Sequence, residues 1–213
     1  MHRFRLLIMP KYKKYTDMKA LITVLFILIT STIFSQIAWI NELHYANSWT
    51  DVNEFVEIVV RNTGEWEEER YLVEFYDGYG RIYLSKNLTE FIKGDTVEDC
   101  LIYYYPFTGD SIQNGHGGMA LSYDSLIING RTALSQFISY GGIILGIYGA
   151  AKDMVSYDVE LIENTTSSPY KSIQLSGEHF IWWGYQWISD TMSPGSVNRQ
   201  QIIRAAPMTI TYE

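Results

Sequence analysis

Two runs of alternating apolar and polar residues between Trp39 and Val60 constrain the fold of this chain more than any other feature. Alternation with a period of two places apolar side chains on one face of an extended strand and polar side chains on the other. The segment that joins the runs, Ala46 to Val52, holds small and polar residues around Trp49. The pattern therefore predicts a strand, a turn and a second strand.

Further short strands follow along the chain. Asp77-Gly78 predicts a hairpin, and Asp124-Ser125 and Asn129-Gly130 predict turns. The strands that we expect are 37–45, 53–60, 71–76, 81–84, 99–105, 117–123, 126–128, 132–140, 171–175 and 185–189. No segment has the apolar stripe of an amphipathic helix. Short strands at this spacing predict an all-β chain that folds as an antiparallel sandwich or barrel.

The first 35 residues have the layout of a secretory signal peptide. Several lysines precede an apolar run, residues 20–34, and the small residue Ser35 follows it. The run is shorter than the roughly 20 residues that a membrane-spanning helix needs. We therefore expect cleavage after Ser35, with Met18 as an alternative start and an uncleaved N-terminal anchor as the other interpretation. After cleavage no transmembrane helix is expected.

The chain that remains after cleavage is long enough for one domain and strongly acidic. Residues 36–213 carry 10 Lys and Arg against 23 Asp and Glu, so their net charge is 10 − 23 = −13. Such a charge repels phosphate backbones and argues against a broad nucleic-acid-binding surface. The single cysteine, Cys100, lies in an apolar run, where we expect a buried thiol. The sheets must then be stabilised by packing, without an intrachain disulfide.

Several segments together resemble a known family. The first is INELHYANSWTDVNEFVEI, Ile40 to Ile58, and the later ones are 112–115, 118–121, 136–141, 172–175 and 193–198. In this order they are similar to the bacterial lamin-tail domain. The resemblance implies an immunoglobulin-like antiparallel β-sandwich over residues 36–198, followed by a short tail, 199–213, that is either a strand or a disordered end.

The chain departs from the family pattern in the first turn. Ala46 stands where the family commonly has Asp, and Trp49 stands where Gly is usual. The loss of that Asp removes an oxygen ligand from the turn. Lamin-tail domains of exported proteins often accompany nucleases or phosphatases, and the 15 residues after Asn198 are too few to form such a domain.

The strongest candidate for chemistry is an acidic group around the first turn. It comprises Glu42, His44, Asp51, Glu54 and Glu57. Carboxylate oxygens from a turn and its flanking strands can bind calcium, which takes six to eight such ligands. We expect Glu42, Asp51 and Glu54 to be the ligands, although Glu54 and Glu57 point to opposite faces of a regular strand. The alternative is a set of solvated or backbone-bonded carboxylates.

An aromatic cluster near the end of the chain is a second candidate. Trp182 and Trp183 are neighbours, so in an extended chain they face opposite ways and at least one is accessible. An exposed aromatic ring can stack on a sugar, whereas a buried one fills the core. The histidines show no zinc spacing, and we expect them to be hydrogen-bonded structural residues.

These observations lead to one leading hypothesis and two alternatives. The leading hypothesis is a secreted or cell-surface, non-enzymatic interaction or adhesion module that binds a protein or a cell-surface glycan. The first alternative is a metal-assisted phosphodiester hydrolase, which rests on the domains that usually accompany this family. The second is a carbohydrate-binding module that uses Trp182 and Trp183.

Overall fold

The computed structural model describes residues 38–48, 50–62, 67–128 and 131–206. The predicted signal peptide, with its cleavage site after Ser35 and its alternative start at Met18, lies outside these ranges. Gln36–Glu213 form one compact unit. Among the described residues, no helix is both long enough and apolar enough to cross a membrane.

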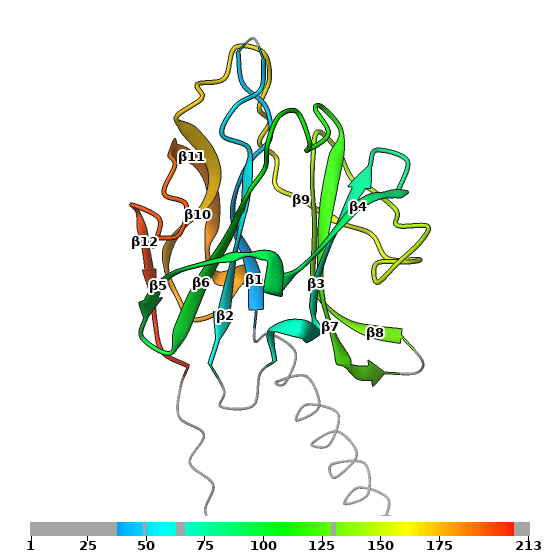
Figure 1. Ribbon diagram of the computed structural model, residues 1–213, viewed down its shortest axis with the longest axis vertical. Coiled ribbons are helices and arrows are strands. Elements are labelled where there is room, and N and C mark those ends of the chain that lie inside the picture. The colour runs from blue at the N-terminus through cyan, green and yellow to red at the C-terminus, as the bar shows by residue number, and fades with distance from the viewer. Residues whose placement is uncertain (1–37, 49, 63–66, 129–130, 207–213) are drawn as a thin grey trace, which may run out of the picture. The chain divides into compact units, whose positions relative to one another are not determined.

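The described residues form two β-sheets that face each other (Figure 1). The strands of the first sheet are β1 Ala38–His44, β2 Phe55–Arg61, β5 Ile92–Val97, β6 Cys100–Pro106, β10 Lys171–His179, β11 Gln186–Thr191 and β12 Gln201–Ile203. Those of the second are β3 Tyr71–Asp77, β4 Ile82–Asn87, β7 Gly117–Ile128, β8 Arg131–Tyr140 and β9 Tyr157–Asp158. Single 3-10 turns lie at η1 Glu68–Arg70, η2 Leu88–Glu90 and η3 Trp182–Gly184. The prediction of an all-β sandwich is confirmed.

The first sheet has the order β11-β10-β1-β2-β6-β5, and the second has the order β4-β3-β7-β8-β9. Neighbouring strands are antiparallel apart from two short pairs, β10 with β12 and β8 with β9, which are parallel. Side chains from the facing sides of both sheets interdigitate in one core. Ile40 and Ile58 contribute to it from the first sheet, and Phe75 and Met119 from the second.

Strand β1 carries a bulge between Ile40 and Glu42, which changes the phase of its alternation. Ile40 before the bulge and Leu43 after it both pack in the core between the sheets. Asn41 and Glu42 lie between them and hydrogen-bond to the C-terminal segment, which we define as residues 193–206. One extra residue therefore places two polar side chains beneath that segment.

The C-terminal segment covers the outer face of the first sheet. Trp39, Val59 and Leu175 point to this face and form a second apolar cluster with Ile203. Cys100 belongs to the same cluster as a buried free thiol, and burial raises its pKa to about 12. The predicted tail, 199–213, thus contains strand β12, which pairs with the end of β10.

A long connection between β8 and β9 covers part of the outer face of the second sheet. We call residues 143–157, which end on the first residue of β9, the excursion. Ile144 and Ala151 of the excursion are buried against Tyr76 and Phe137 of the sheet. Each sheet therefore packs against apolar side chains on both of its faces. The alternation in the sequence predicted one apolar face and one polar face for each strand.

Three details of the strand prediction are wrong. Strands β5 and β9 were not predicted, and β7 continues from Gly117 to Ile128 through the Asp124-Ser125 pair that was expected to be a turn. Strands β7 and β8 remain paired beyond Tyr123, and the register of the pair shifts between Tyr123 and Ile128. The predicted turn at Asn129-Gly130 lies outside the described residues.

Candidate functional site

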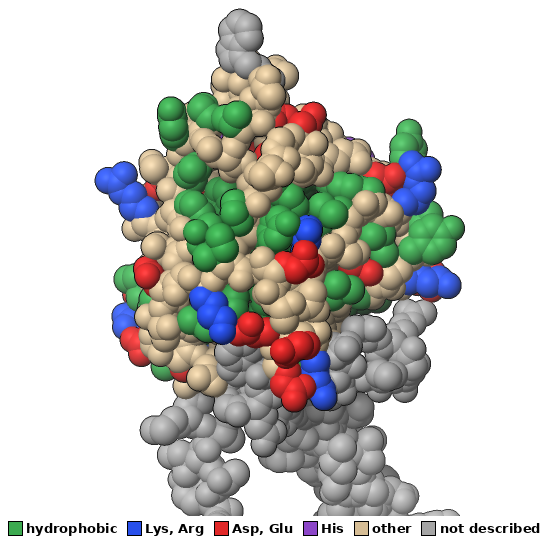
Figure 2. All heavy atoms as spheres, in the orientation of Figure 1, with side chains coloured by type: hydrophobic (Ala, Val, Ile, Leu, Met, Phe, Trp, Pro, Cys, Tyr) green, Lys and Arg blue, Asp and Glu red, His purple; other side chains and the backbone are tan. Residues whose placement is uncertain are grey.

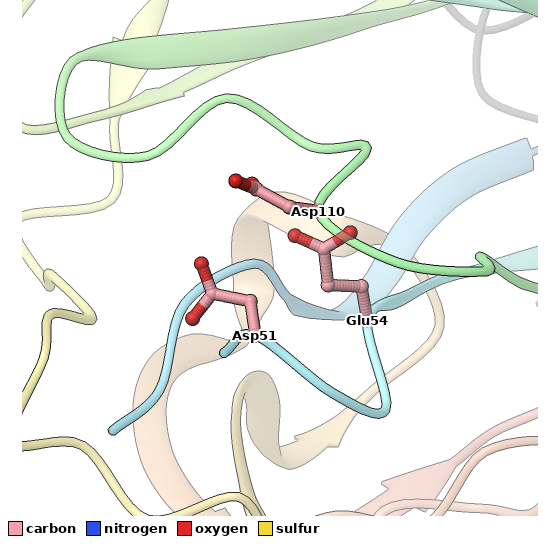
Figure 3. A group of neighbouring side chains, drawn as sticks. All are labelled: Asp51, Glu54 and Asp110. Atoms are coloured by element: carbon pink, nitrogen blue, oxygen red, sulfur yellow. The ribbon is translucent and has the colours of Figure 1, made fainter. Parts of the chain in front are cut away.

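Two loops at one end of the sandwich bring three carboxylates together. Asp51 and Glu54 lie in the connection between β1 and β2, and Asp110 lies in the connection between β6 and β7. One oxygen from each side chain can be chosen so that all three lie within 4.8 Å of one another. Figure 3 shows the three side chains and the two loops from which they come. In the part of the chain that the structure describes, none of these carboxylates pairs with Lys or Arg. We call them the loop carboxylates.

Asp51 ties the two loops to each other. Its Oδ1 accepts a 2.7 Å hydrogen bond from the backbone N–H of Asn47, which closes the first turn. Its Oδ2 accepts a 2.6 Å bond from Nδ2 of Asn114 in the second loop. Both oxygens already have a donor, so Asp51 holds a fixed position in the group.

Glu54 is the most buried member of the group, with 1% of its surface exposed against 7% for Asp51. Its Oε2 accepts backbone N–H bonds from Ser111 at 2.7 Å and Ile112 at 3.2 Å. Its Oε1 is buried and has no hydrogen-bond partner. Burial raises the pKa of Glu54 to about 7, the two N–H bonds oppose the rise, and the charges of Asp110 and Asp51 add to it.

A pocket of about 480 Å³ opens beside the loop carboxylates. Asn47, Asp51, Asp110 and Asn114 line it from one side, and Glu163 lines it from the connection between β9 and β10. Asn47 is 1% exposed, and its Oδ1 is also buried without a hydrogen-bond partner. The pocket is therefore rich in oxygen atoms, and two of the buried ones nearby are unpaired.

His44 is fully used in holding this end of the molecule together. Asn47 Nδ2 donates to its Nε2 at 2.9 Å, so its Nδ1 carries the proton and donates to Glu163 at 2.8 Å. Glu163 also accepts the backbone N–H groups of Tyr45 and Ala46 at 2.6 and 3.1 Å. These contacts give His44 the structural role that the sequence indicated, and no ring nitrogen is left for a ligand.

Glu42, the third expected calcium ligand, lies outside this group. It is fully buried beneath the C-terminal segment, where it accepts bonds from the Ser172 hydroxyl and from the N–H and hydroxyl groups of Ser193. Its register partner Glu57 is buried beside it and accepts bonds from Asn41 Nδ2 and Gly195 N–H at 2.9 and 2.7 Å. We call Glu42 and Glu57 the buried pair.

The pKa values of the buried pair are both raised. Burial is the main cause for each, and it brings Glu42 to about 7. For Glu57 the charge of Glu42 is the second cause, and its pKa lies well above the ordinary value. At neutral pH the two carboxyl groups thus resist ionising together.

The two expected ligand-binding tryptophans have different surroundings. They lie in the 3-10 turn η3, so they are not in an extended segment. Trp183 is 61% exposed and lies near the ring of His179, with a centroid distance of 5.5 Å. Trp182 packs against the cluster under the C-terminal segment and meets Tyr157 edge-on. Only Trp183 presents most of its surface to solvent.

The excursion presents a group of exposed apolar side chains that the sequence did not reveal. Its inner residues are buried, but its outer side chains are more than one third exposed: Ile143, Leu145, Ile147, Tyr148, Met154, Val155 and Tyr157. Leu145 and Val155 form an antiparallel bridge, and Ile144 and Ser156 hydrogen-bond through their backbones. These exposed side chains thus project from a two-stranded segment that is held by backbone hydrogen bonds.

No known family, curated protein or solved structure matches the chain. The features of the molecule that indicate a function are the loop carboxylates, Trp183 and the excursion.

Proposed function

We propose that this chain is an exported, non-enzymatic interaction module with a lamin-tail-like, immunoglobulin-like fold, and that it binds a protein partner through the outer surface of the excursion. The observation that carries the proposal is the group of exposed apolar side chains between Ile143 and Tyr157. Scattered surface apolar residues are normal, but a contiguous set of them is typical of interaction sites.

The backbone of the excursion supports this role. Residues directly opposite in an antiparallel pair lie on the same face, so Leu145 and Val155 stand side by side and point outward together. Across the same pair, the backbone N–H of Gly146 donates a 2.9 Å hydrogen bond to the carbonyl oxygen of Met154. A surface that is already ordered loses little conformational entropy on binding, which favours affinity.

Charge indicates the kind of partner. Residues 36–213 carry a net charge of −13, so two copies of the chain repel each other. A partner whose apolar contact surface is surrounded by Lys and Arg is attracted instead. We therefore expect binding to a basic protein surface at the cell envelope, and we expect the complex to weaken as salt is added.

The test is the binding of purified residues 36–213 to the envelope fraction of the producing cells. Changing both Leu145 and Val155 to Asp places charges in the middle of the apolar surface, and binding should fall on the order of tenfold or more. Ile92→Asp is the matched control, because Ile92 is 47% exposed but lies on the edge strand β5. Equal binding by all three proteins would contradict the proposal.

Trp183 supports one second candidate, a carbohydrate-binding module. Its 61% exposure leaves a ring face free for a sugar. A glycan array tests this candidate: specific glycan binding that Trp183→Ala removes and the excursion variant retains would favour it over a protein partner. Absence of any glycan signal would leave the protein-binding proposal in place.

A further inference from the structure

The loop carboxylates have a feature that ordinary surface acidic groups lack, which is a buried oxygen without a donor. Glu54 is 1% exposed, its Oε1 has no hydrogen-bond partner among the described residues, and Figure 3 shows its carboxylate turned toward Asp110. A buried acceptor that is left unpaired destabilises the fold, and a charged one does so more strongly. A cation among the three carboxylates would satisfy this oxygen.

From this we propose that Asp51, Glu54 and Asp110 bind one calcium ion at the mouth of the loop pocket, a site distinct from the interaction surface on the excursion. All three contribute carboxylate oxygen, the ligand type that hard divalent cations prefer. When all three are ionised their charges add to −3, and in the described chain no Lys or Arg is paired with them. The ion would offset the repulsion between them.

The number of protein ligands favours calcium over magnesium. Mg²⁺ demands near-ideal octahedral geometry, keeps several water molecules and is usually bound through one or two carboxylates. Ca²⁺ accepts a flexible arrangement of six to eight oxygens at about 2.3–2.6 Å, so two of its ligands can be up to about 5 Å apart. Three carboxylates whose oxygens lie within 4.8 Å of one another are compatible with this coordination.

Neighbouring residues can complete the coordination. Asn47 lines the same pocket and has a buried Oδ1 without a partner. Asp110 is exposed, so water can reach the ion from the open side. Three carboxylates, an amide oxygen and water molecules together reach the six to eight ligands of calcium.

The experiment is a thermal unfolding titration of residues 36–213 with calcium, magnesium or a chelator, applied to the unmodified chain and three variants. Glu54→Gln keeps an oxygen for the Ser111 and Ile112 N–H groups but removes the charge. Asp110→Asn changes a side chain for which the described residues provide no hydrogen-bond donor. Glu178→Gln is the control, because Glu178 is an exposed carboxylate on β10 whose ion-pair partner among the described residues is Arg204.

The expected result is a rise of several degrees in the Tm of the unmodified chain and of Glu178→Gln at millimolar calcium, relative to each protein in chelator. Glu54→Gln should lose the shift, and Asp110→Asn should need on the order of tenfold more calcium for it. The proposal is overturned if calcium leaves the unmodified Tm unchanged, or if Glu54→Gln retains the full shift. An equal shift with magnesium at the same concentration would overturn the assignment to calcium.

Discussion

Two groups of carboxylates lie at different places in the sandwich, one beneath the C-terminal segment and one in two loops, and they differ in what their oxygens contact. In the buried pair, Glu42 and Glu57 each accept hydrogen bonds on both oxygens, from serine hydroxyls, an asparagine amide and backbone N–H groups. Among the loop carboxylates, Glu54 has one oxygen with two donors and one with none. Both groups raise the pKa of a glutamate, so the pKa alone does not distinguish them.

The difference teaches how to separate structural from binding carboxylates. Donors surround the buried pair because the C-terminal segment folds over it, and Ser193 and Gly195 of that segment donate directly to it. These carboxyl groups therefore hold a piece of the chain in place. Asp51 and Asp110 line a pocket of about 480 Å³, and the unpaired oxygen of the neighbouring Glu54 has no hydrogen-bond partner in the described chain.

The largest expected effect is that of Glu42→Ala. The substitution removes the acceptor of the Ser172 hydroxyl and of both Ser193 donors, and it leaves a cavity beneath the C-terminal segment. We expect the free energy of unfolding to fall by about 2–4 kcal/mol in a chemical denaturation experiment. A loss below about 1 kcal/mol would mean that Glu42 does not hold the segment.

The next effect is the pH dependence that the buried pair introduces. The pKa of Glu42 is raised from 4.5 to about 7, so the unfolded chain releases this proton at lower pH than the folded chain does. Stability from this group is complete below about pH 4.5 and is lost as the pH rises to about 7. At about 1.4 kcal/mol per pKa unit, the loss is up to about 3 kcal/mol.

Glu42→Gln isolates that contribution, because its amide oxygen can still accept from Ser172 and Ser193 and it does not ionise. The stability of the variant relative to the unmodified chain should therefore increase between pH 5 and pH 8, measured by denaturation at each pH in chelator. A constant difference across this range would contradict the assignment of the raised pKa to Glu42.

A smaller effect is expected at the loop carboxylates. Without calcium, Glu54→Gln removes a buried charge beside Asp51 and Asp110, whose repulsion helps to raise the Glu54 pKa to about 7. The shift from 4.5 to about 7 corresponds to up to about 3 kcal/mol at pH 8. The buried Gln amide group that takes the place of the unpaired Oε1 offsets part of this, so the variant should be more stable than the unmodified chain in chelator by about 1–2 kcal/mol. Lower stability in chelator would show that the Glu54 charge is already compensated.

The smallest effect is expected for Asp110→Ala in chelator. The side chain is exposed, and no described residue donates a hydrogen bond to it, so the free energy of unfolding should change by less than about 0.5 kcal/mol. The two alanine variants can then be compared directly. Glu42→Ala should lower the free energy of unfolding clearly, and Asp110→Ala should leave it nearly unchanged. A loss similar to that of Glu42→Ala would end the distinction between the two groups.

The sequence predicted the fold class well, because the strands that build the core alternate visibly. It did not predict β5, whose side chains are mostly exposed and polar. An edge strand of this kind needs no apolar face, so the alternation is absent. The sequence also did not predict which side chains of the excursion are exposed. Leu145 and Val155 face solvent but are as apolar as the buried Ile144, so the apolar pattern does not separate the two faces.

The candidate site was predicted in part. Asp51 and Glu54 flank one turn, and their proximity follows from the sequence alone. Asp110 comes from another loop, and its surroundings read as an ordinary Gly-Asp-Ser turn, so only the packing of the loops reveals it. Glu42 was grouped with them because strand periodicity cannot show the bulge after Ile40, which places Glu42 under the C-terminal segment.

The most direct test of the difference between the two groups is calorimetric titration of calcium into residues 36–213 and into two isosteric variants. The predicted result is one calcium ion per chain for the unmodified protein and for Glu42→Gln, with no binding heat for Glu54→Gln. Binding that Glu42→Gln abolishes and Glu54→Gln retains would contradict it.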